Sequence, residues 1–189
     1  MRFLTALFVG ALTLLGAGPV QAHTGAGAIS GLASGIVHPF TGPDHVLAMV
    51  LIGLWSSQIA GRALWAVPLA FVASMTIGGA VAMAGIAVPF VELAAALSVL
   101  LLGAVIAGRV RAPVAFAMLI AAIFGAVHGH AHGTEMPALG SAAAYAAGFV
   151  LATMLLHAIG IAIGIGTRSV LIVRCLGGTA MVAAAVLIA

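Results

Sequence analysis

Histidines and carboxylates in this sequence of 189 residues gather in two short motifs. The first motif, HPFTGPDH, covers residues 38–45 and supplies His38, Asp44 and His45. Met49 follows His45 by four residues, so an imidazole and a thioether would share one face of a helix. This pair suits a borderline or soft transition metal, and a carboxylate can orient a ligating histidine. The alternative role for Asp44 is a favourable charge in the first turn of a helix.

The second motif, HGHAHGTE, covers residues 128–135. In a helix, His128, His132 and Glu135 would fall on one face, at positions i, i+4 and i+7, with His130 pointing away. Two histidines and a carboxylate are a common ligand set for zinc, nickel or cobalt. The two glycines of the motif weaken the assumption of a helix, so the alternative is a histidine-rich solvated loop.

Three further residues could lie on the path of such an ion. His157 lies deep in an apolar segment and is either an inner station or a packing histidine. Glu92 lies near the end of another segment, where partial exposure to water would lower the free-energy cost of a carboxylate. His23 could chelate a metal through its α-amine and imidazole if the chain is cleaved just before it. With Met49 and His130, these residues are the candidates for a metal path.

The composition indicates that lipid surrounds most of the chain. Hydrophobic residues make up 65% of the sequence and charged residues only 5%, whereas soluble domains carry roughly 25% charged residues. A short chain cannot bury so much apolar surface in one core. Since only helices and closed barrels span a bilayer, long apolar segments predict an all-α, polytopic membrane helix bundle. The arginines are scattered singly, which argues against a nucleic-acid partner.

The N-terminus has the pattern of a secretory signal peptide. Arg2 precedes an apolar run, and Val20-Gln21-Ala22 fits a small-residue cleavage site. We therefore expect a signal peptide at residues 1–22 and one membrane domain at residues 23–189, with an uncleaved anchor as the alternative.

Proline, glycine and arginine divide the rest of the chain into six apolar segments close to the length of a bilayer span. The segments are Asp44–Ile59, Ala63–Ala84, Pro89–Ala107, Pro113–His128, Ala138–Ile165 and Ser169–Ile188. A shorter Gly/Ser-rich stretch, Ala26–Val37, precedes them, and a Gly/Pro break separates it from the first. It is either a re-entrant half-helix or the upper part of one broken transmembrane helix.

The placement of arginine predicts the orientation. Arg62, Arg109, Arg111 and Arg168 follow the first, third and fifth segments. With six spans and an exported N-terminus, these loops are cytoplasmic, as the positive-inside rule requires. All three carboxylates and most histidines then collect at the outer face. Ionisable groups in spans usually mark a pathway.

The two motifs resemble the signatures of the HupE/UreJ family of nickel and cobalt permeases. HPFTGPDH matches the pattern H-x5-D-H, and VHGHAHGTE matches (F)HG-x-A-H-G-x-E, with Val127 in place of phenylalanine. The resemblance extends to LASGIVHPFTGPDHVLAM and to ATMLLHAIGIAIG. It implies six transmembrane helices in a bacterial inner membrane and nickel import for hydrogenase or urease maturation. It also implies that the functional residues are His38, Asp44, His45, His128, His132 and Glu135.

The resemblance therefore implies a permease that carries Ni²⁺, or Co²⁺, inward from the periplasm, with a periplasmic mature N-terminus. The ligand chemistry alone leaves nickel, cobalt, zinc and copper open. We expect no enzymatic activity and no permanently bound cofactor, because the ion is cargo. The lipid bilayer and the ion are the expected partners, and the oligomeric state stays open. No nucleotide-binding GxxxxGK[ST] motif is present. The alternative is an intramembrane zinc-dependent hydrolase, in which the same ligands would hold Zn²⁺ and activate water.

Overall fold

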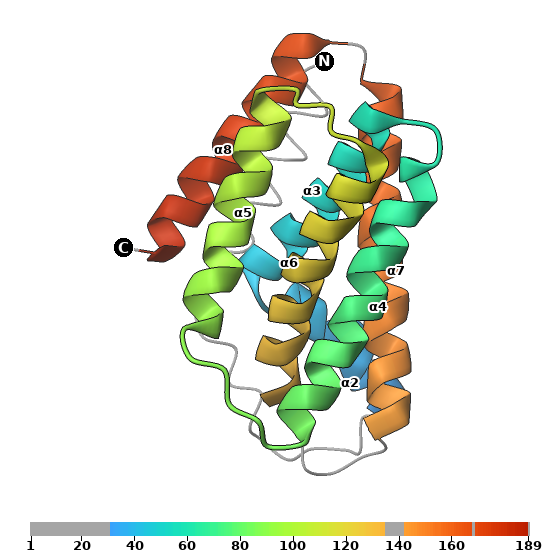
Figure 1. Ribbon diagram of the computed structural model, residues 1–189, viewed down its shortest axis with the longest axis vertical. Coiled ribbons are helices and arrows are strands. Elements are labelled where there is room, and N and C mark those ends of the chain that lie inside the picture. Colours follow the sequence, from blue (N-terminus) through green and yellow to red (C-terminus); the bar gives the residue numbers. More distant parts are fainter. Residues whose placement is uncertain (1–30, 135–141, 168, 189) are drawn as a thin grey trace.

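The computed structural model describes residues 31–134, 142–167 and 169–188, and every regular element in these ranges is a helix (Figure 1). This confirms the predicted all-α class. The predicted signal peptide, His23 and Glu135 lie outside the described residues, as does the predicted start of the fifth segment at Ala138.

Each of the six predicted segments contains one long helix. These helices are α3 (Pro43–Ile59), α4 (Ala63–Met83), α5 (Val91–Ala107), α6 (Val114–Thr134), α7 (Ala142–Gly166) and α8 (Val170–Ile188). The predicted end of the fourth segment at His128 is wrong, because α6 continues through the second motif to Thr134. The glycines that weaken this turn also let it pack: a Cβ on Gly129 would meet the backbone carbonyl of Met75 in α4. Close packing of this kind offsets the low helix propensity of glycine.

The described helices have the dimensions and surface of membrane spans. By length and composition, α4, α6, α7 and α8 could each cross a membrane, and α5 is apolar but shorter. Large apolar side chains face outward along them, such as Ile77, Leu119, Leu151 and Val182. A soluble protein rarely exposes so much apolar surface, whereas a bilayer accommodates it.

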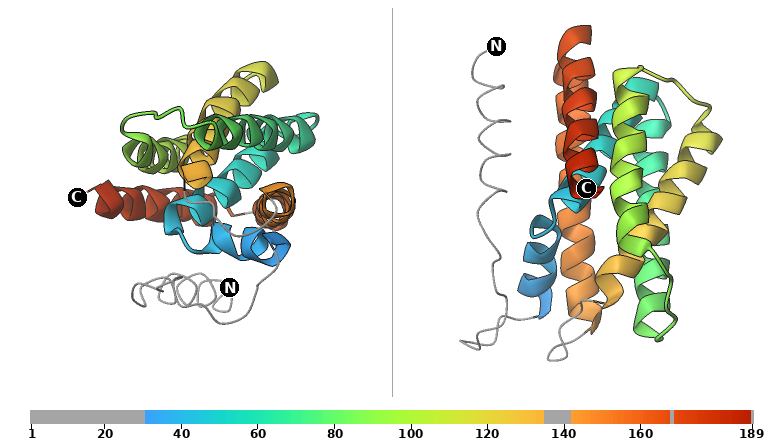
Figure 2. Two further views of the ribbon diagram at one scale, coloured as in Figure 1. Left: turned by 90° about the horizontal axis from the view of Figure 1, so that it is seen from below. Right: turned by 90° about the vertical axis from the view of Figure 1, so that its left-hand side faces the viewer.

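The Gly/Pro break interrupts one long helical segment. The short helix α2 (Gly31–Val37) leads into a 3₁₀ turn, η1 (His38–Phe40), and α3 begins after Gly42, whose backbone is extended. α2 packs near the start of α7 and α3 packs farther along it, so the two pieces follow α7 one after the other (Figure 2). Of the two predicted arrangements, this is the broken helix and not the re-entrant one.

Small residues bring the helices together in pairs: α4 with α6, α3 with α7, and α5 with α8. Gly78 packs on the backbone of Ala126, and Gly160 packs on the backbone of Val50, so any side chain at either glycine would collide with the partner helix. These glycines therefore allow the close helix contacts that small residues form in membrane bundles. The pairs α3/α7 and α4/α6 place the two histidine motifs within one bundle.

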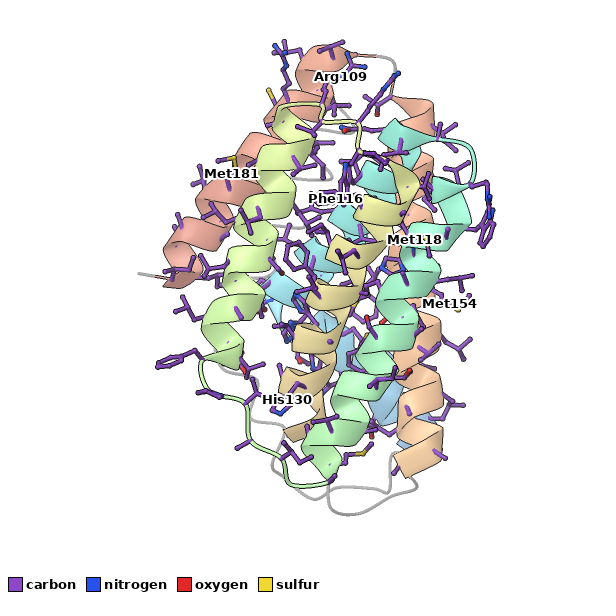
Figure 3. The ribbon with its side chains drawn as sticks, in the orientation of Figure 1. Arg109, Phe116, Met118, His130, Met154 and Met181 are labelled. Carbon is purple, nitrogen blue, oxygen red and sulfur yellow. The ribbon has the colours of Figure 1, made fainter. Side chains whose placement is uncertain are left out.

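Arg109 and the second histidine motif lie toward opposite ends of this bundle. Arg109 lies at one end and His130 near the other, as Figure 3 shows. At the arginine end, a polar cavity of about 140 Å³ is lined by Arg109, Arg111, Gln58 and Thr167, among others. The predicted separation from the histidine motifs therefore holds for Arg109 and Arg111, whereas Arg168 lies outside the described residues.

Candidate metal-binding site

Four imidazoles from the two motifs meet at one place inside the bundle. We call His38, His45, His128 and His132 the histidine cluster. The ring centroids of His45 and His132 are 3.8 Å apart, those of His38 and His132 are 4.8 Å apart, and those of His45 and His128 are 5.0 Å apart. His45, His128 and His132 are buried, and His38 is half-buried. The motifs, more than 80 residues apart in sequence, thus form one site.

The helix break positions the α3 half of the cluster. Pro43 takes the first helical position, where its missing N–H costs nothing, and Asp44 and His45 follow in the first turn. A Cβ at Gly42 would lie 2.9 Å from Cδ2 of His45 and 3.0 Å from Oδ1 of Asp44. Glycine at this position therefore lets both side chains fold back over the helix start.

Helical geometry positions the α6 half. Because α6 remains helical to Thr134, His128 and His132 lie one turn apart on the face that meets α3. His130 points away, as predicted: its Nε2 lies 2.8 Å from the carbonyl oxygen of Ile86, in the loop between α4 and α5. The alternative of a histidine-rich solvated loop is therefore wrong for residues 128–133, which form a buried part of α6.

A chain of hydrogen bonds determines the tautomer of His128. Ser98 of α5, fully buried, donates its only hydroxyl hydrogen to the carbonyl of Ala95 at 2.7 Å. Its oxygen therefore accepts at the other contact, from Nε2–H of His128 at 2.9 Å. In neutral His128 the lone pair then lies on Nδ1. This atom accepts a hydrogen bond from Nδ1–H of His45, and the two nitrogens are 3.1 Å apart. Ser98 thus directs a metal-binding nitrogen of His128 toward His45.

The distance between these two nitrogens fits two ligands of one ion. With metal–nitrogen bonds of about 2.0–2.1 Å, two neighbouring ligands of a tetrahedral or octahedral ion lie roughly 2.9–3.3 Å apart. An ion bonded to both nitrogens would replace the hydrogen bond between His45 and His128, and it would lie about 1.3 Å to one side of the line that joins them. In the described ranges, no three metal-binding side chains form a ready-made coordination group, because the other rings pack edge to face. A third ligand requires one of those rings to turn.

The cluster has a negative neighbour and an aromatic wall. Oδ2 of Asp44 lies 3.4 Å from Nδ1 of His45, close enough to offset positive charge there. Phe149 packs against His132 with ring centroids 4.4 Å apart, and Tyr145 packs against His38 at 5.6 Å. A cavity of about 70 Å³ opens beside His132, with room for at least two waters at about 30 Å³ each. Its apolar lining would limit access of bulk water.

The remaining predicted residues lie apart from the cluster. Glu92 is exposed in the first turn of α5. Met49 is fully buried one turn inward from His45. His157 is buried much deeper, in α7. The structure therefore brings together five of the six residues proposed as ligands, and the sixth, Glu135, lies outside the described residues.

Sequence reasoning did not identify Ser98 or Phe71. Ser98 is a single hydroxyl in an apolar helix, which has no pattern to distinguish it from a packing residue. Phe71 of α4 lies against both His128 and His157, with ring centroids 5.9 and 5.2 Å apart. Only the helix packing reveals these contacts.

Comparison with known proteins adds an independent result. The family profile described as HupE / UreJ protein matches residues 11–187. The chain is also similar to Protein HupE of Rhizobium leguminosarum bv. viciae, with 42% identity over 171 residues, which is 89% of each chain. No solved structure matches the chain.

Proposed function

The chain belongs to the HupE/UreJ family, and from that premise we propose that it carries a divalent transition-metal ion across the membrane. The proposed ion is Ni²⁺, with Co²⁺ as the second choice, and the direction is from the periplasm to the cytoplasm. The ion would supply the metallation of a hydrogenase or urease. The histidine cluster would be the site at which it is captured.

The observation that carries this proposal is the meeting of buried imidazoles from α3 and α6. Imidazole binds nickel, cobalt, zinc and copper well, and hard cations such as magnesium poorly. The 3.1 Å separation of the Nδ1 atoms of His45 and His128 fits a shared ion. Burial removes competing water, so an ion held there exchanges its hydration shell for protein nitrogens.

Charge supports capture at this end of the bundle. Asp44 lies beside the cluster, and Glu135 follows His132 by three residues. These two carboxylates would offset the charge of a divalent ion that has lost its water. An inward membrane potential then supplies about 4.6 kcal/mol per 100 mV for a divalent cation. Facilitated diffusion down this potential is the simplest energy source.

We propose six transmembrane spans, with the histidine cluster toward the periplasm and the arginine end in the cytoplasm. α2, η1 and α3 together would form the first span, and α4 to α8 the other five. The positive-inside rule supports this orientation. A cleaved signal peptide at residues 1–22 would leave a periplasmic N-terminus in a bacterial inner membrane.

Metal accumulation in cells that express the chain tests the proposal. Uptake is measured for nickel, cobalt, zinc and copper, in wild type and in His45→Ala. We expect nickel uptake to be abolished in His45→Ala while the amount of protein in the membrane is unchanged. The lipid-facing change Met154→Leu, on α7, is the matched control and should leave uptake intact. Undiminished uptake by His45→Ala would remove the cluster from the transport site.

Metal retention by the purified protein tests the hydrolase alternative. A hydrolase keeps its catalytic zinc, whereas a permease must release its ion. We expect purified protein to lose bound metal to a chelator. Retention of one zinc per chain through chelator washes would favour the hydrolase.

A further inference from the structure

His157 is a buried histidine without a hydrogen bond in the described part of the chain. It lies in the inner half of α7 and is 2% exposed, and neither ring nitrogen has a partner there. An unsatisfied buried polar group costs about 1–3 kcal/mol. A histidine kept only to join two helices would make a hydrogen bond between them. A bound metal ion would give the unpaired ring nitrogens of His157 a partner.

A thioether faces the same region from the neighbouring helix. Thr153, one turn before His157 on α7, donates its hydroxyl to Sδ of Met75 on α4, at 3.7 Å. Phe71, one turn before Met75, packs its ring at 89° to the ring of His157. The pair Thr153 and His157 therefore faces the pair Phe71 and Met75. Both possible metal ligands, His157 and Met75, are buried.

The third neighbouring helix, α3, contacts α7 at His157 through its backbone. A Cβ on Gly53 of α3 would collide with the carbonyl of His157, so no side chain of α3 can enter at that point. Met49 lies between His45 and Gly53 on the same face of α3, by the four-residue spacing. This face of α3 therefore runs from the histidine cluster to the level of His157.

Two features connect this inner region with the histidine cluster. Phe71 lies against both His128 and His157, so the centroids of those two imidazoles are at most about 11 Å apart. Met75 also lines the cavity that opens beside His132. An ion leaving the cluster through that cavity would therefore meet Met75 next.

We propose that His157 and Met75 form a second, inner binding station for the transported ion, with the ring of Phe71 in contact with both His157 and His128 of the histidine cluster. This inference rests on the proposed transport function. Imidazole and thioether together select a borderline or soft divalent ion of the nickel, cobalt or copper class and disfavour magnesium and calcium. The hydroxyl of Thr153 holds the thioether in place until the ion arrives.

The charge distribution makes the inner station the weaker one. Of the two carboxylates among the described residues, Asp44 lies beside His45 and Glu92 is exposed in the first turn of α5. A divalent ion at the inner station would therefore have two neutral ligands and, within the described ranges, no carboxylate ligand. Its occupancy is therefore brief, as conduction requires, because an ion must be able to leave each site.

Nickel binding by the purified full-length chain in lipid nanodiscs tests this inference. Equilibrium dialysis against increasing nickel gives the number of ions per chain and the affinity of each. We expect wild type to bind two ions, one tightly and one weakly. His157→Leu should lose the weak ion, keep the tight one at unchanged affinity, and transport nickel at least tenfold more slowly.

A pair of methionine variants tests the other ligand. Met75→Leu should weaken the second ion at least tenfold, whereas Met154→Leu should not change it, because Met154 lies on the outer surface of α7 (Figure 3). If His157→Leu does not insert into the membrane, His157→Asn keeps a polar side chain of smaller size and should show the same loss.

The outcomes separate this inference from the function on which it rests. A wild-type chain that binds one ion, lost in His45→Ala and kept in His157→Leu, would overturn the inner station and leave the permease intact. Full transport by His157→Leu would do the same. A wild-type chain that binds no nickel would contradict the proposed function itself.

Discussion

Replacing Ser98 with alanine isolates the role of one hydrogen bond behind the histidine cluster. Its hydroxyl oxygen accepts from Nε2–H of His128 at 2.9 Å while its hydrogen goes to Ala95. In Ser98→Ala, the Nε2–H of His128 keeps no acceptor in a fully buried site. The ring can then move its proton to Nδ1, which removes the lone pair that faces His45.

The expected size of the effect follows from this loss. An unsatisfied buried donor costs about 1–3 kcal/mol. Removing an outer partner of a ligating histidine usually lowers metal affinity about 10–100-fold, or roughly 1.4–2.8 kcal/mol at 1.4 kcal/mol per factor of ten. The two ranges agree. We therefore predict that Ser98→Ala weakens nickel binding by roughly one to two orders of magnitude.

Ser56→Ala is a closely matched control. Ser56 is also fully buried and also donates to a carbonyl of its own helix, that of Ile52 at 2.7 Å, but no contact links it to the cluster. Nickel affinity is measured by isothermal titration and uptake by metal accumulation, both relative to the amount of folded protein. Equal nickel affinities for Ser98→Ala and Ser56→Ala would refute the tautomer argument.

Three other changes test the packing and charge around the site. Gly129→Ala should lower the free energy of unfolding by about 1–3 kcal/mol or more, because the new Cβ would overlap the α4 backbone. Gly178→Ala should not lower it, because the space around Gly178 is open. Equal melting temperatures for the two variants would contradict the packing of α6 on α4. His130→Ala removes the bond to Ile86 and should cost about 1 kcal/mol of stability without a change in nickel affinity, and a tenfold loss of affinity would place His130 in the site. Asp44→Asn should weaken nickel binding and keep the fold, since it removes charge but little volume; unchanged affinity would exclude its electrostatic role.

The sequence predicted the helices well because the apolar segments are bounded by proline, glycine and arginine. It failed at the end of α6, where glycines suggested a loop. A glycine has low intrinsic helix propensity, but Gly129 and Gly133 fit directly against α4. Tertiary packing therefore decided the structure of this turn, and no local rule contains that information.

The site was predicted in part for a similar reason. Dense histidine motifs identify their own ligands, and helical spacing correctly turned His130 away from His128 and His132. The contributions of Ser98 and Phe71 depend on which faces of α4, α5 and α6 meet. Ser98 has no neighbours in sequence that mark it, so its hydrogen bond to His128 is visible only in the packed bundle.

The most direct test is nickel K-edge X-ray absorption on the full-length chain loaded with one equivalent of nickel. We predict scattering from at least two imidazoles, with one fewer in His45→Ala and one fewer in His128→Ala. Coordination by oxygen alone, unchanged in both variants, would show that the histidines of α3 and α6 do not share an ion.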